Sequence, residues 1–132
     1  MLDKVIVDTE ESAPPIGPYS QAVKCGNTLF LSGQIAMDPK TRRLVGKDAA
    51  QQTEQVLQNI EAILRYMGLT LGHVVRCSVF VVDLAEMRAI NEVYAKHFAV
   101  DQPARTTVQV AALPGGARVE IEATAVLPPS PS

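Results

Sequence analysis

One arginine and one glutamate near the end of the chain suggest chemistry on a small acid. Arg105 lies in a Pro-Ala-Arg-Thr-Thr run at 103–107, and Glu120 lies in an Arg-Val-Glu-Ile-Glu stretch at 118–122. A guanidinium presents a planar pair of N–H donors that matches a carboxylate in a two-point contact. A glutamate held in a sheet can orient a water molecule or remove its proton. The pair therefore predicts a site for a substrate that carries a carboxylate.

Both members of this pair also have a plainer explanation. An arginine at the start of a strand is commonly solvated. Glu120 alternates with Val119 and Ile121, so it faces the opposite side together with Glu122, which is also typical of a solvent-exposed acidic stripe. If a second subunit covers that side, one of the two acids is buried at a subunit boundary, where its proton affinity changes. The alternation alone leaves both explanations open.

Further candidates come from loops and strand ends. Tyr19 ends a Gly-Pro-Tyr loop, where a phenol could close over a pocket, and Ser32 precedes Gly33, which permits close approach of the backbone to a ligand. His73 and His97 have no partner at catalytic spacing, so we assign them structural or surface roles.

Composition restricts the class of protein. The 132 residues are 47% apolar, which predicts one packed domain over residues 1–132 with a frayed tail at about 128–132. The formal net charge of −2 gives no broad attraction for nucleic acid or anionic membranes, so we expect neither as a partner. Cys25 and Cys77 show no CxxC spacing, and no metal motif, P-loop or nucleophile elbow is found. Without a membrane-length apolar run or a signal layout, a soluble, cytoplasmic protein is expected.

Hydrophobic periodicity predicts six strands and two helices around the candidate residues. The first helix is expected at 49–67, where apolar residues recur every three or four positions. Asp48 and Gln51 form a capping-box-like start, and Gly68 supplies a left-handed residue at the end. The loop at 13–18 carries three prolines and fits neither a helix nor a central strand. Strands are expected at 4–7, 22–25, 29–35, 74–82, 106–112 and 118–126.

The second helix is expected to begin at Asp83, which is followed by a carboxylate three residues later. Its predicted inward-facing residues are Leu84, Met87, Ile90, Tyr94 and Phe98. The strand at 74–82 is nearly all apolar or β-branched, which predicts a central position with both faces covered.

The resulting order, β-β-β-α-β-α-β-β, predicts one α+β domain. Two helices can cover one face of a six-stranded sheet, so the other face must find a partner or remain polar. We expect an oligomer, with a monomer that has a polar outer face as the alternative.

Five motifs, in order along the chain, resemble the Rid family of reactive intermediate deaminases, also called YjgF-like proteins. They lie at 17–22, 32–35, 91–94, 103–105 and 119–122. The resemblance runs essentially end to end and is strongest to the RidA-type enamine/imine deaminases. It implies a chorismate-mutase-like fold with a six-stranded mixed sheet, two helices on one face, and a homotrimer with clefts between subunits.

The resemblance also implies an activity and a set of site residues. The activity is hydrolysis of 2-imino acids such as 2-iminobutanoate and 2-iminopropanoate to 2-oxo acids and ammonia, without a metal or organic cofactor, which would spare pyridoxal-phosphate enzymes from damage. Arg105 would hold the substrate carboxylate, and Glu120 would activate the attacking water. The substrate-binding residues implied are Tyr19, Ser32, Gly33, Asn91, Arg105 and Thr107. RidA-type proteins often have cysteine where Thr107 stands, and activity is expected to survive because the role falls largely on the backbone carbonyl.

Strand geometry constrains where such a site can form. If the last two strands paired directly, Arg105 and Glu120 would lie roughly 16 Å apart, too far for one water to bridge. Either another strand order brings them together, with the final strand inserted in a mixed sheet, or the two residues come from different subunits. We favour a pocket between subunits.

Three other functions are possible alternatives to the deaminase. The main one is a non-enzymatic small-acid-binding or chaperone-like trimer, against which the presence of both Arg105 and Glu120 argues. A chorismate mutase would need several converging cations, and only one is evident. An endoribonuclease is disfavoured by the acidic balance of the chain.

Overall fold

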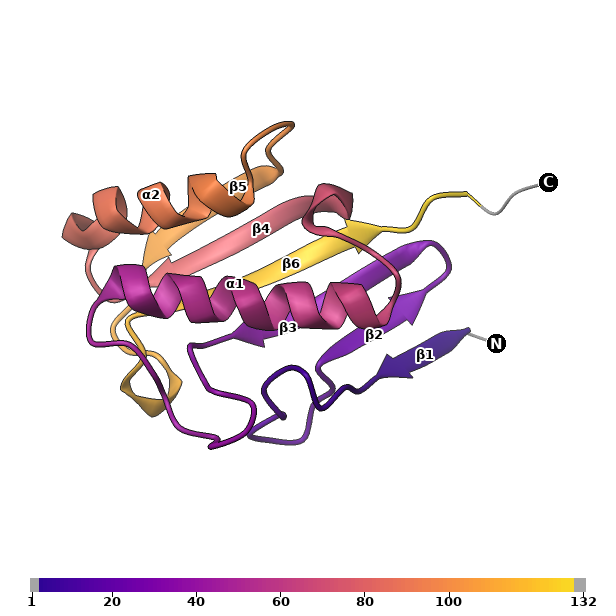
Figure 1. Ribbon diagram of the computed structural model, residues 1–132, viewed down its shortest axis with the longest axis horizontal. Helices are drawn as coiled ribbons and strands as arrows, with labels where there is room; N and C mark the ends of the chain where they lie inside the picture. Colours follow the sequence, from indigo (N-terminus) through magenta and orange to yellow (C-terminus); the bar gives the residue numbers. More distant parts are fainter. Residues whose placement is uncertain (1–2, 130–132) are drawn as a thin grey trace.

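Residues 3–129 of the computed structural model form one mixed sheet with two helices packed on it (Figure 1). Within this range the sheet has six strands in the order β1-β2-β3-β6-β4-β5, and β4 and β5 run parallel while the other neighbours are antiparallel. The strands are β1 (Lys4–Val7), β2 (Ala22–Cys25), β3 (Thr28–Gln34), β4 (Val74–Val81), β5 (Ala104–Gln109) and β6 (Val119–Val126). The helices are α1 (Ala49–Tyr66) and α2 (Met87–His97). The predicted order of elements and the α+β class are confirmed.

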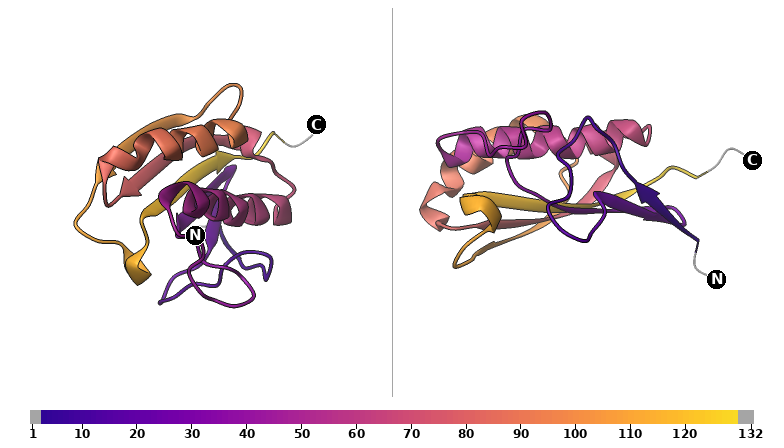
Figure 2. Two further views of the ribbon diagram at one scale, coloured as in Figure 1. Left: turned by 60° about the vertical axis from the view of Figure 1, so that its left-hand side comes forward. Right: turned by 90° about the horizontal axis from the view of Figure 1, so that it is seen from below.

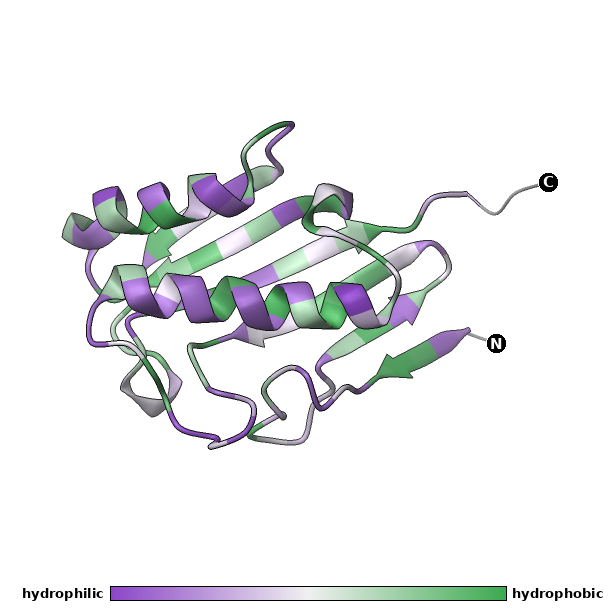
Figure 3. Ribbon diagram, in the orientation of Figure 1, coloured by the Kyte–Doolittle hydropathy of each residue, from purple (hydrophilic) through white to green (hydrophobic). Residues whose placement is uncertain are grey.

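Both helices lie on the same side of the sheet, as the view from below shows (Figure 2). The opposite side has no covering element among residues 3–129. Each strand therefore divides its side chains between a helix-covered face and an open face, and the alternation of apolar and polar residues along β6 is visible in Figure 3. Of the tail predicted at 128–132, the structure describes residues 128 and 129, and residues 130–132 lie outside the described residues.

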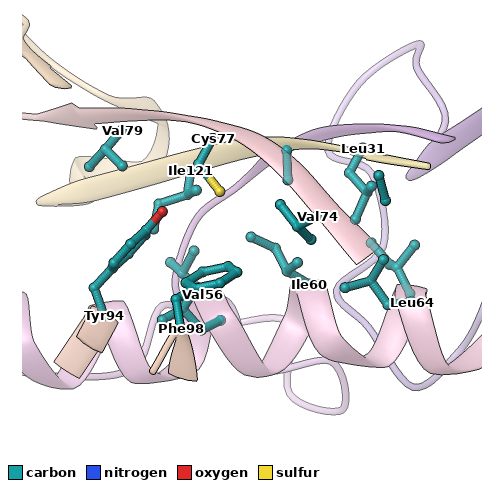
Figure 4. Close-up of a cluster of buried hydrophobic side chains, with 14 of the residues drawn as sticks. Leu31, Val56, Ile60, Leu64, Val74, Cys77, Val79, Tyr94, Phe98 and Ile121 are labelled. Atoms are coloured by element: carbon teal, nitrogen blue, oxygen red, sulfur yellow. The ribbon is translucent and has the colours of Figure 1, made fainter. Parts of the chain in front are cut away.

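Capping residues mark both ends of helix α1. The Asp48 carboxylate accepts a hydrogen bond from the Gln51 backbone N–H at 2.8 Å, and Gly68 just beyond the helix has a φ of +73°. Between them, Val56, Ile60 and their apolar neighbours pack against the sheet (Figure 4). The start predicted from the sequence is confirmed. Over residues 3–129, neither α1 nor any other helix is both long and apolar enough to cross a bilayer.

The second helix begins later than predicted. The Asp83 carboxylate caps a short 3-10 helix, Leu84–Glu86, by accepting from the Ala85 N–H at 2.9 Å, and α2 starts only at Met87. Leu84 is 49% exposed, so its predicted inward orientation is wrong. The tighter 3-10 turn rotates Leu84 away from the apolar stripe that the rest of the helix presents to the sheet.

Strand β4 is interior to the sheet, since it pairs with β6 on one side and β5 on the other. Its expected coverage on both faces is wrong for the single chain. Cys77, Val79 and Val81 are buried under the helices, whereas Phe80 is partly exposed on the open face and Arg76 is exposed there. Two helices cover one side of the sheet, so the second side is left open within one chain.

The last two strands are not paired with each other. β6 lies between β3 and β4, and β5 forms the edge of the sheet beside β4. The predicted strand at 106–112 is observed two residues earlier at its start and three residues earlier at its end. The simple terminal hairpin is thereby excluded. The final strand is inserted in the sheet, but this strand order does not bring Arg105 and Glu120 together within one chain.

Candidate active site

Arg105 lies on the helix-covered face at the edge of the sheet. It is in register with Cys77 of β4, which is buried under the helices. Its Nη1 donates a hydrogen bond to Oδ1 of Asn91 at 2.9 Å, and its guanidinium carbon lies 4.8 Å from the centroid of the Tyr94 ring. Both partners belong to α2. Thr107 follows two residues later on the same face and is half-buried. The contacts with Asn91 and Tyr94 therefore hold the guanidinium in one orientation at the exposed edge of the sheet.

Glu120 lies on the open face of the sheet. It is opposite Phe80 in β4, and its half-buried side chain leans on Gly33 of β3. A methyl group at Gly33 would come within 2.9 Å of Glu120 Cδ, so the absence of a side chain at Gly33 is what makes room for the carboxyl group. Burial, and to a lesser extent the nearby Glu122 carboxylate, raise the pKa of Glu120 above its ordinary value. A raised pKa suits a group that exchanges protons near neutral pH.

Ser32 belongs to the same part of β3, and Tyr19 lies in the loop beside it. The Ser32 hydroxyl donates to the Ser20 carbonyl at 2.6 Å, which ties the Gly-Pro-Tyr loop to the strand. The Tyr19 hydroxyl accepts from the Ile16 N–H at 3.2 Å, and the Tyr19 side chain is exposed. Tyr19 and Gly33 line one small cleft together with apolar loop residues. The loop and the bulged end of β3 thus form one wall near Glu120.

Gln21 holds the loop of this wall in place through buried hydrogen bonds, and it was not among the residues predicted from the sequence. Its side chain is buried, accepts from the Thr9 N–H at 2.7 Å, and donates to the Thr9 and Ala13 carbonyls at 3.0 and 2.8 Å. These bonds satisfy backbone groups that a proline-rich loop cannot pair in a ladder. A polar residue directly before the strand at 22–25 was the available signal.

The candidate residues form two separate groups within one chain. Strand β4 lies between β5 and β6, and Arg105 and Glu120 are three rows apart along the strands. At about 4.8 Å per strand and about 3.3 Å per residue, their Cα atoms are roughly 14 Å apart. Their side chains also leave opposite faces of the sheet. The structure brings Arg105, Asn91 and Thr107 together on one side, and Glu120 and Gly33 together on the other, with Tyr19 and Ser32 adjacent.

The two histidines hold helices and turns in place. His73 accepts from the Thr70 N–H at the start of a 3-10 helix. His97 of α2 contacts Glu61 at 2.7 Å and Glu54 at 2.9 Å, both on α1. Burial alone would lower the pKa of His97, but the two carboxylates raise it. No group of three or more His, Cys, Asp or Glu side chains converges as a metal site in the part of the chain that the structure describes.

Known proteins are similar to this sequence over nearly its whole length. A family model described as Endoribonuclease L-PSP matches residues 10–127. Reactive Intermediate Deaminase A, chloroplastic, from Arabidopsis thaliana is 45% identical over 96% of this chain and 67% of its own length. The human 2-iminobutanoate/2-iminopropanoate deaminase is 41% identical over 97% of this chain and 93% of its own.

A solved structure has the same fold. The crystal structure of E. coli TdcF with bound serine is 40% identical, has a TM-score of 0.87, and covers 92% of this chain and 98% of its own. The chain therefore belongs to the YjgF/Rid family of small α+β proteins. Its relatives' names support a deaminase role in the family.

Proposed function

We propose that this protein is a homotrimeric deaminase that hydrolyses 2-imino acids, such as 2-iminobutanoate and 2-iminopropanoate, to 2-oxo acids and ammonia. The observation that carries the proposal is the division of the site residues into two incomplete halves on opposite faces of one sheet. One half offers a carboxylate receptor, Arg105, and the other offers a proton-transfer group, Glu120. A neighbouring subunit that brings its Arg105 beside Glu120 completes the site.

The open face of the sheet supports assembly. Ile6 is 54% exposed and Phe30 is 52% exposed on this face, and Val108 lies on it as well. Large exposed apolar side chains on an uncovered sheet are typical of a subunit interface. The half-buried Glu120 shares this face, so contact with a second chain would bury it further.

The chemistry needs little from the protein because an imine is already electrophilic. Arg105 binds the carboxylate and fixes the imine carbon beside a water molecule. Glu120 takes a proton from that water as its oxygen bonds to the imine carbon and returns this proton to the imine nitrogen, which gives a neutral carbinolamine. Glu120 then takes the proton of the new hydroxyl group and passes it to the nitrogen, as the C–N bond breaks and the C=O bond forms. Ammonia and a 2-oxo acid leave.

Relatives support the substrate class. The human relative is named for 2-iminobutanoate and 2-iminopropanoate, and E. coli TdcF was solved with serine, which also carries a carboxylate. We place the activity in the cytoplasm, where it would remove imines released by pyridoxal-phosphate enzymes. The family description names an endoribonuclease, but a net charge of −2 offers little to an RNA backbone.

The test is the decay of 2-iminobutanoate generated in situ. We expect the wild type to accelerate the decay, Arg105→Ala to raise KM strongly, and Glu120→Gln to lower kcat by about 10²-fold or more. Arg65→Ala, which changes an exposed arginine on α1, is the matched control. Decay at the buffer rate with folded wild-type trimer would reject the deaminase and favour a non-enzymatic small-acid-binding or chaperone-like trimer.

A further inference from the structure

The side chain of Arg105 rests on an aromatic ring. Its guanidinium carbon lies 4.8 Å from the centroid of the Tyr94 ring, which is within the range of a cation–π interaction. Arg105 itself is exposed on an edge strand. A long side chain in that position would otherwise sample many rotamers.

Tyr94 is a rigid support. It is 5% exposed, and its ring packs against the Phe98 ring with centroids 4.7 Å apart. Figure 4 shows Tyr94 reaching from α2 toward the sheet near Cys77. The Tyr94 hydroxyl is buried without a conventional hydrogen-bond partner among the described residues, and the Cys77 thiol beside it is a weak one. The contribution of Tyr94 to Arg105 therefore comes from the ring.

Asn91 fixes the same guanidinium from a second direction. It lies three residues before Tyr94, so both side chains project from one side of α2. Asn91 accepts a hydrogen bond from Nη1 of Arg105, while Nε and Nη2 have no hydrogen-bond partner within residues 3–129. The edge formed by Nε and Nη2 is the one left for a two-point contact with a carboxylate.

We propose that Tyr94 is a positioning residue that holds the guanidinium plane of Arg105 so that its Nε/Nη2 edge meets the substrate carboxylate. The inference rests on the proposed function, in which Arg105 is the carboxylate receptor. Ordering the arginine before the substrate arrives removes the cost of ordering it on binding. Tyr94 thereby acts on substrate affinity and leaves the proton transfer at Glu120 unchanged.

The test compares Tyr94→Leu, which removes the ring, with Tyr94→Phe, which keeps it. We expect Tyr94→Leu to raise KM for 2-iminobutanoate and Kd for 2-oxobutanoate about fivefold to tenfold, with kcat within about twofold. Tyr94→Phe should restore most of the affinity. Tyr66→Leu changes an exposed tyrosine on α1 and is the matched control. Thermal unfolding of each variant checks that it is folded.

A second measurement does not depend on a variant. In the wild type, NMR resonances of the Arg105 side chain should be shifted upfield by the Tyr94 ring current, and random-coil shifts would overturn the inference.

A third measurement uses a double variant. In an Arg105→Ala background, Tyr94→Leu should have no further effect on the Kd for 2-oxobutanoate. An equal loss in that background, or unchanged affinity in folded Tyr94→Leu, also overturns it.

The outcomes separate the two proposals. A wild type that binds 2-oxobutanoate and depends on Tyr94 but hydrolyses no imine rejects the proposed function alone. An active wild type whose affinity ignores Tyr94 rejects the positioning role alone. A wild type that neither binds nor hydrolyses rejects both.

Discussion

Mixing two variants that are each nearly inactive at low substrate concentration should restore activity, because Arg105 and Glu120 lie on opposite faces of one sheet and cannot serve the same site within a chain. The variants are Arg105→Ala and Glu120→Gln. Their Cα atoms are separated by the width of β4 and by three residues along the strands, roughly 14 Å in all. Each site would take its arginine from one subunit and its glutamate from the next.

The expected magnitude follows from random assembly. In closed trimers formed from equal amounts of the two variants, about one quarter of all sites would receive both native residues. In trimers that contain both variants, whichever is in excess, about one site in three would do so. The specific activity of purified mixed trimers should therefore reach about a third of the wild-type value, while each variant alone stays near background.

The assay needs mixed trimers of known composition. The two variants would carry different affinity tags, be co-expressed, and be purified through both tags before imine decay is measured. Wild-type chains with the same tags control for the tags themselves. Mixed trimers that are as inactive as their parents would refute a site shared between subunits and would require Arg105 and Glu120 to act separately.

Two further substitutions probe particular contacts. Gly33→Ala should lower kcat about tenfold or more, because the new methyl group would lie 2.9 Å from Glu120 Cδ and displace the carboxyl group. Little stability should be lost, since the Glu120 side chain can move. An unchanged kcat would contradict this contact. His97→Gln should destabilise the protein more at about pH 6 than at about pH 9. The pKa of His97 is raised in the folded state, so its stabilising contribution is complete below the unfolded pKa and is lost as pH rises through the folded pKa. Thermal unfolding across that range is the measurement, and a pH-independent difference would argue against the assignment.

Local signals in the sequence were sufficient for most elements. The three-and-four spacing of apolar residues, with Asp48 and Gly68 at the ends, located α1 because capping is decided within a few residues. The prediction for Leu84 failed because a 3-10 turn and an α-helix place the same residue on different sides, and periodicity alone does not distinguish them.

Strand order depended on contacts that local patterns do not contain. The short connection between β5 and β6 favours a hairpin, yet the fold inserts β6 into the middle of the sheet. Burial explains the choice: Val119, Ile121 and Ala125 of β6 are fully buried, whereas most of β5 is exposed. Residue type and position were enough to single out Arg105, Glu120, Tyr19 and Ser32, and the resemblance added their roles. The division of the candidate residues between two faces required the strand order.

The position of β6 also governs how the chain can fold during synthesis. It is the last of the six strands to be translated, and it fills the gap between β3 and β4. Until it arrives, both of those strands expose unpaired edges and apolar side chains, which are templates for association with other chains. The edges of β3 and β4 that β6 pairs with therefore stay open until residues 119–126 have left the ribosomal tunnel, and the native sheet can be completed only then.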